Sequence, residues 1–121
     1  MELAYWIVAG LLAVLYLYSG VLKVVRTQEQ LRPMMGWVDQ IPMPLVRTIG
    51  VLEVLGAAGL ILPPLTGTAV GLAIAAAVGL VLIQVGAIAV HLSRKEVSVI
   101  GLNIGLLAAA GVTVWLGTTW L

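Results

Sequence analysis

The sequence contains no cysteine and no phenylalanine, and it has a single histidine. Without cysteine, the chain alone cannot form a disulfide, carry a CxxC redox centre, use a thiolate nucleophile or ligate an iron–sulfur cluster. One histidine, His91, cannot by itself provide both ligands of a bis-histidine haem or a zinc site within one chain. We therefore expect no metal site and no intrinsic cofactor.

Charge is also scarce, because only 9% of the 121 residues are charged whereas 62% are hydrophobic. Soluble domains are typically about 25% charged and about 45–50% apolar, so this composition indicates a membrane protein. The net charge of +1 and the lack of a basic run with interleaved aromatic residues argue against nucleic-acid binding.

The sequence does contain four long apolar runs, at approximately residues 3–25, 45–62, 67–91 and 98–118. Each run can cross the ~30 Å hydrocarbon core as an α-helix. The charged connections 26–44 and 92–97 and a turn at "PPLTG" separate them. We predict a single domain over residues 1–121, an all-α membrane protein folded as an antiparallel, up-down bundle of four transmembrane helices.

The positive charges predict the orientation of this bundle. All six lysines and arginines lie at or between the ends of the first and second runs or of the third and fourth: Lys23, Arg26, Arg32, Arg47, Arg94 and Lys95. The positive-inside rule places those connections in the cytoplasm and both termini outside, in the cell (inner) membrane. An outer aromatic belt would then comprise Tyr5, Trp6, Trp115 and Trp120.

Glu53 is the one charged residue within the apolar segment "IGVLEVLGAAGLILP". Nine residues from Pro44, it would lie roughly 13 Å deep along the helix axis. A carboxylate at the bilayer centre costs about 2.5–3.5 kcal/mol on insertion scales, so it should have a partner. Lys23, His91 and Asn103 are the candidate partners, and a pair with Lys23 would be either a structural link that fixes helix order or part of a functional site.

Other polar residues are predicted to gather near this pair. Side chains lean toward the N-terminus of their own helix, so polar groups on oppositely directed helices converge on one layer in the cytoplasmic half. The candidates for ligand binding or proton transfer in this layer are Glu53, Lys23, His91, Asn103, Tyr16, Ser19 and Gln84. A catalytic residue cannot be assigned from the sequence.

Small residues are expected at the helix contacts, because burial of apolar surface does not drive association in lipid. The packing candidates are Gly20, Gly50, Gly56, Gly101 and Gly105. Gly101 and Gly105 form a GxxxG pair, a pattern that also occurs in dimers. We expect contacts within the bundle, with a homodimer as the alternative.

Four segments resemble the DoxX-like family of small membrane proteins: "LYLYSGVLKVV", "GWVDQIPMPLVRTIGVLEVLGAAGLILP", "AVHLSRKE" and "NIGLL". The resemblance covers nearly the whole chain and implies a four-helix bundle. Its SGxxK pattern matches Ser19, Gly20 and Lys23, and its GxxExxGAxGLxLP pattern includes Gly50 and Glu53. The family takes its name from membrane subunits of a quinone-linked thiosulfate-oxidising system, and other members are proposed to assist redox assemblies.

Three functions remain open from the sequence. The first is an accessory subunit, or a binder of a lipid-soluble ligand such as a quinone or lipid, with a membrane or redox protein as partner. The second is a quinone-linked oxidoreductase subunit, which would need an electron carrier from a partner. The third is a small proton-coupled transporter that uses Glu53. We favour the first and do not expect catalysis by this chain alone.

Overall fold

The computed structural model describes residues 2–95 and 97–121, with residues 97–99 described by their backbone only. Four long helices make the bundle: α1 (Glu2–Val25), α3 (Met43–Thr66), α4 (Gly71–Ser93) and α5 (Val97–Gly117). The short elements are α2 (Gln28–Leu31), η1 (Gly36–Asp39) and η2 (Thr118–Trp120). No strand occurs in the described residues, and the four long helices are long and apolar enough to cross a membrane. The predicted all-α fold of four transmembrane helices is confirmed.

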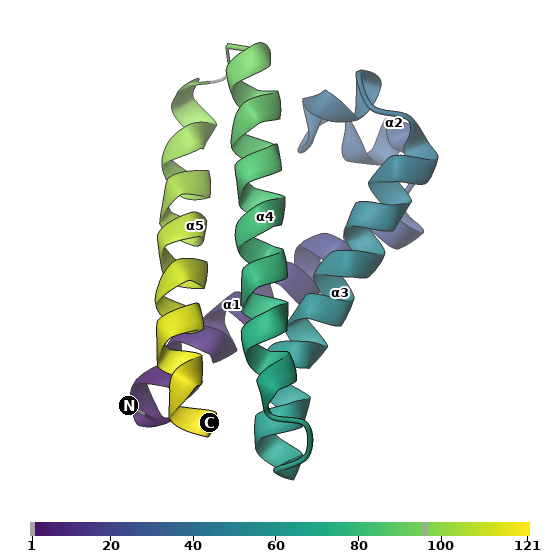
Figure 1. The fold of residues 1–121 in the computed structure, drawn as a ribbon. Coiled ribbons are helices and arrows are strands. Elements are labelled where there is room, and N and C mark those ends of the chain that lie inside the picture. The colour runs from purple at the N-terminus through teal and green to yellow at the C-terminus, as the bar shows by residue number, and fades with distance from the viewer. Residues whose placement is uncertain (1, 96) are drawn as a thin grey trace.

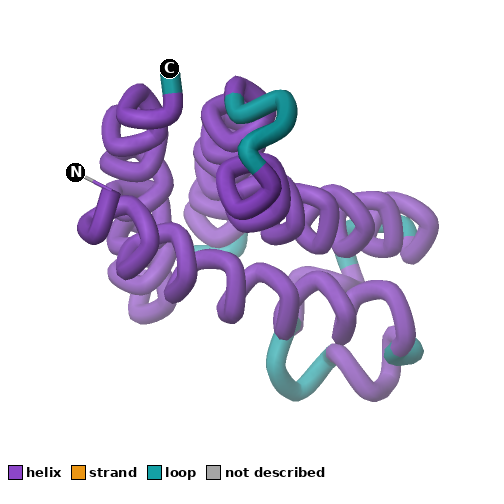
Figure 2. Tube along the Cα trace, turned by 90° about the horizontal axis from the view of Figure 1, so that it is seen from below, coloured by secondary structure: helices purple, strands orange, loops and turns teal. Residues whose placement is uncertain are grey.

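The helices form a closed cycle of neighbours, in which α1 packs on α3, α3 on α4, α4 on α5 and α5 on α1. The axes of α4 and α5 are nearly aligned, with the chain running in opposite directions, whereas α1 and α3 are tilted relative to them (Figure 1). Both termini lie at the same end of the bundle (Figure 1). Seen from that end, α1 and α3 run side by side away from the α4–α5 pair (Figure 2). The two helix pairs therefore diverge with distance from the termini.

Two apolar clusters fill the interior. The larger one joins all four long helices and includes Tyr5, Leu12, Leu60, Leu80 and Leu116. The smaller one packs the connection between α1 and α3 onto those helices, through Leu22, Leu31, Val38 and Val46.

The end of α3 differs from the prediction. The segment "PPLTG" was expected to form a turn after residue 62, but Pro63 and Pro64 lie inside α3, which continues to Thr66. The helix ends instead at Gly67, whose φ of 70° is the left-handed conformation that glycine adopts readily at a helix C-terminus. Helix α4 accordingly begins at Gly71 rather than at residue 67.

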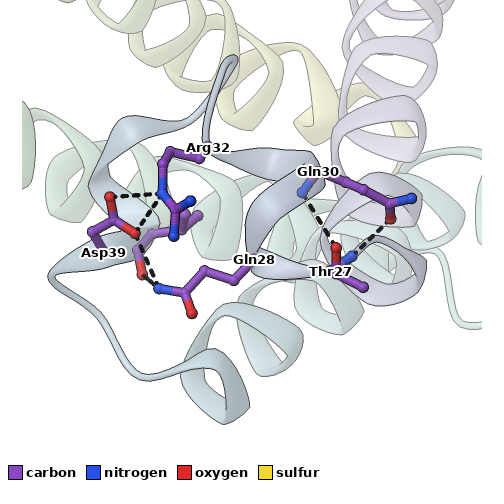
Figure 3. A network of polar contacts seen from close by, with 6 residues as sticks. Thr27, Gln28, Gln30, Arg32 and Asp39 are labelled. Carbon is purple, nitrogen blue, oxygen red and sulfur yellow. Dashed lines mark hydrogen bonds and ion pairs between the residues drawn. The ribbon is translucent and has the colours of Figure 1, made fainter.

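The connection between α1 and α3 is folded rather than an open loop (Figure 3). Thr27 and Gln30 form a reciprocal capping box at the start of α2, with hydrogen bonds of 3.2 and 3.0 Å. Arg32 Nε donates to both carboxylate oxygens of Asp39, at 2.9 and 3.0 Å, and Gln28 Nε2 donates to Asp39 Oδ1 at 3.1 Å. These contacts hold η1 against α2.

The aromatic residues near the termini do not all face outward. Trp115 is 62% exposed, as a position in an aromatic belt requires. Tyr5 is fully buried, and its ring makes edge-on contacts with Trp6 and Trp120 at centroid distances of 5.7 and 5.2 Å. The expectation that Tyr5 belongs to the belt is therefore wrong, because its ring packs in the core.

Candidate functional site

One side of the candidate site is formed by α1 and α3, whose backbones are in direct contact. A Cβ on Gly20 would lie 2.7 Å from the carbonyl oxygen of Gly50, and a Cβ on Gly50 would lie 2.8 Å from that of Gly20. No L side chain fits at such distances without a shift of the backbone. Two glycines therefore permit the close approach of these helices.

Lys23 and Glu53 each follow one of these glycines by three residues, so they lie on the same face as the contact. Because α1 and α3 run in opposite directions, the two side chains lean toward each other. The Lys23 ammonium donates to Glu53 Oε1 in a buried ion pair and to Ser19 Oγ at 2.7 Å. It also lies 5.7 Å from the ring centroid of Trp37. The glutamate that the sequence placed inside hydrocarbon thus has a cationic partner.

A second polar contact links α1 to α4. Gln84 Nε2 donates to Tyr16 Oη at 2.6 Å, and both side chains are buried. In the described part of the chain, Gln84 Oε1 has no hydrogen-bond partner, although it is buried. Asn103 Nδ2 on α5 is likewise buried without a partner among those residues.

These groups surround one cavity of about 570 Å³. Its lining includes every residue predicted for the polar layer: Tyr16, Ser19, Lys23, Glu53, Gln84, His91 and Asn103. The structure therefore brings together side chains from all four long helices. Their role in binding or proton transfer stays a prediction.

The remaining wall of the cavity is apolar and reaches the outer surface of the bundle. Among its lining residues, Tyr18 of α1, Leu82 of α4 and Leu102 of α5 are each more than 60% exposed. In a membrane, these side chains face lipid. The cavity thus joins a buried polar wall to the hydrocarbon around the protein.

The connection between α1 and α3 contributes lining residues that were not predicted. Met34, Met35, Trp37 and Ile41 all border the cavity. A signal for them exists in the sequence, since these large apolar side chains occur in a connection otherwise rich in charged and polar residues. The connection is therefore part of the site.

The predicted helix-packing glycines fall into two groups. Gly20, Gly50 and Gly56 lie at contacts, the last with a Cβ position 2.8 Å from Leu80 Cδ2. At Gly101 and Gly105, a Cβ would meet no atom within 4 Å among the described residues, and both glycines are exposed. The expectation that these two pack within the bundle is wrong, because their side of α5 faces outward.

A match to one protein family agrees with this architecture. No curated protein and no solved structure gives a match to the chain. A scan against protein families matches residues 7–114 to the DoxX-like family. That match covers most of the chain, including the Gly20–Gly50 contact and all of the cavity's polar lining. The chain is therefore a multi-pass membrane protein that belongs to the DoxX-like family.

Proposed function

We propose that this protein binds a lipid-soluble ligand, a quinone or a lipid, in the cavity between its helices, as an accessory subunit rather than a catalyst. The observation that carries the proposal is the cavity of about 570 Å³, polar on its inner wall and apolar where it reaches the outer surface. Small-molecule sites are typically about 300–1,000 Å³, mostly apolar, with a few convergent polar groups.

The lining supplies the contacts that such a ligand needs. Tyr16, Lys23 and Asn103 carry hydrogen-bond donors, and Glu53 carries acceptors. The ligand's apolar part would lie against the exposed side chains at the mouth, which gives it a path from the bilayer. A polar head at the inner wall and a tail in lipid describe both quinones and membrane lipids.

The contact between Glu53 and Lys23 favours binding over proton transport. A proton carrier has to leave its ionic partner each time it takes up a proton, whereas this carboxylate is held in a buried ion pair with the Lys23 ammonium group. A quinone-linked oxidoreductase role would need an electron carrier from a partner protein. We place the protein in the cell (inner) membrane, with the cavity in its cytoplasmic half and a membrane or redox protein as partner.

Native mass spectrometry of gently extracted protein tests the proposal, combined with lipid and quinone analysis of what co-purifies. Gly86 lines the cavity, and a Cβ there meets no atom within 4 Å among the described residues. Gly86→Leu should therefore narrow the cavity from a lining position at which a Cβ meets no neighbouring atom of the described residues. Gly79→Leu is the matched control, because Gly79 lies on the same helix with equal space but is not in the lining.

We expect a small molecule to be retained by the wild type and by Gly79→Leu, and to be lost from Gly86→Leu. If a folded Glu53→Gln variant also loses the small molecule, the ion pair takes part in binding. A wild type that carries no specific molecule, or equal retention in all variants, would contradict the proposal.

A further inference from the structure

Two residues that line the cavity each have a buried amide atom without a hydrogen-bond partner among the described residues, and the two atoms differ in kind. Gln84 Oε1 is a hydrogen-bond acceptor, and Asn103 Nδ2 is a donor. The two residues are 5% and 8% exposed. Buried polar atoms in native proteins are nearly always hydrogen-bonded, so a pair without partners in the described structure points to a ligand that supplies them.

Of these two atoms, Gln84 Oε1 restricts the chemistry of the ligand more. The Gln84 amide group already uses its Nε2 to donate to Tyr16 Oη, which leaves its oxygen for a ligand. Only a ligand with an O–H or N–H can pair with that oxygen. A carbonyl group accepts hydrogen bonds but cannot donate them, so it would satisfy Asn103 and leave Gln84 Oε1 unpaired.

The neighbouring cation does not pair with this oxygen in the described structure. The Lys23 ammonium donates to Glu53 Oε1 and Ser19 Oγ, which leaves one of its three N–H groups for a ligand. The other donors that we assign to the lining for ligand contact are Asn103 Nδ2 and the hydroxyl of Tyr16, whose oxygen accepts from Gln84. Beside the Glu53 carboxylate, which is paired with Lys23, the inner wall thus combines donors with the unpaired acceptor Gln84 Oε1.

We infer that the ligand of this cavity carries a hydroxyl group on an apolar skeleton, which donates to Gln84 Oε1 while an oxygen of the same head group accepts from Asn103 Nδ2. This inference rests on the proposed function and narrows its ligand class. Two membrane-soluble sources have this chemistry, a hydroquinone and a glyceride alcohol such as diacylglycerol. In either case, the form without the free hydroxyl should bind less well.

Binding measurements on the full chain in lipid nanodiscs distinguish a hydroquinone from a glyceride alcohol. They use two matched pairs of probes. One pair is a decyl-substituted benzohydroquinone, kept reduced, and its benzoquinone. The other is dioctanoylglycerol and its O-acetyl ester. The Kd of each probe is measured for the wild type and for Gln84→Met, which keeps the length of the side chain but removes the amide.

A buried donor outside the cavity provides the control variant. Trp120 Nε1 is buried beside Tyr5 and Trp6, on which the Trp120 ring packs, and Trp120 is not in the cavity lining. Trp120→Phe therefore removes a buried polar group from the opposite end of the bundle and should leave every Kd unchanged.

One of the two probe pairs should resemble the natural ligand in its head group. Within that pair, we expect the form with the hydroxyl to bind the wild type about fivefold tighter, or more, than the form without it. Gln84→Met should remove this preference and leave the weaker probe's Kd nearly unchanged. Binding of both forms with equal Kd, or a preference that survives Gln84→Met, would overturn the inference while leaving the proposed function intact. No binding of any probe would contradict the proposed function itself.

Discussion

Tyr5 on α1 donates a hydrogen bond from its hydroxyl to the carbonyl oxygen of Leu60 on α3, at 2.6 Å. In an α-helix, that carbonyl would accept from the N–H of residue 64, which is a proline and has none. Both Tyr5 and Leu60 are fully buried. Tyr5 therefore replaces the donor that Pro64 lacks, and α3 can continue through its two prolines while it is bound to α1.

Tyr5→Phe should lower the free energy of unfolding by about 1–3 kcal/mol, because it leaves the buried Leu60 carbonyl unpaired. In a Pro64→Ala background the loss should be smaller, since the introduced alanine would supply the missing helical N–H. The measurement is reversible unfolding in mixed micelles. Tyr18→Phe is the control, because Tyr18 is 61% exposed. An equal loss from Tyr5→Phe in both backgrounds would show that the two changes do not act on the same carbonyl.

The contact between Gly20 and Gly50 predicts opposite effects for two alanine substitutions on α1. In Gly20→Ala, the new Cβ would lie 2.7 Å from the Gly50 carbonyl oxygen, so α1 and α3 must separate. Overpacking of this kind typically costs about 1–3 kcal/mol. In Gly10→Ala, the Cβ meets no atom within 4 Å among the described residues, and alanine favours the helix by about 0.5–1 kcal/mol. Unfolding midpoints that fall equally for both variants would contradict this account.

The sequence was sufficient to predict the four helices and which polar side chains meet, for a physical reason. Apolar run length and charge placement are local properties, and the lean of side chains in antiparallel helices brings Lys23 toward Glu53 without knowledge of the packing. The end of α3 could not be predicted in this way. The donor that compensates for Pro64 lies on another helix, 55 residues from Leu60 along the chain, and Tyr5 only reaches that carbonyl once the helices have packed.

The glycine contacts and the connection between α1 and α3 also could not be predicted from local sequence patterns. A GxxxG pair predicts a surface that permits close approach, but it does not say what approaches, and Gly101 and Gly105 face outward. Trp37 lies beside Lys23, and its place there depends on how α2 and η1 fold back over the helices. Tertiary packing, rather than local pattern, determines both outcomes.

The distribution of positive charge predicts that the α3–α4 turn lies outside and the connection between α1 and α3 lies in the cytoplasm. Because the chain has no cysteine, one can be introduced at a time without a background substitution. Thr68 and Glu29 are both exposed, one in each region. In intact cells, a membrane-impermeant maleimide should label Thr68→Cys at once and Glu29→Cys only after lysis. The reverse pattern would invert the orientation.

The buried ion pair predicts a non-additive mutant cycle. Glu53→Gln and Lys23→Met should each lower the free energy of unfolding by about 3–5 kcal/mol, because each leaves one buried charge without its partner. The double variant should recover part of that loss, since no unpaired charge remains. The exposed pair of Arg32 and Asp39, with side chains 49% and 44% exposed, is the control. Its cycle should give a coupling of less than about 1 kcal/mol.

Additive losses at Lys23 and Glu53 would show that the two charges do not depend on each other for their stability in the bilayer. Glu53 would then need a different partner, and the proposed ligand would become the candidate for it. Strong coupling instead means that the pair is satisfied within the protein. A ligand in the cavity would then be recognised chiefly by the amide groups of Gln84 and Asn103, whose unpaired atoms have no partner among the described residues.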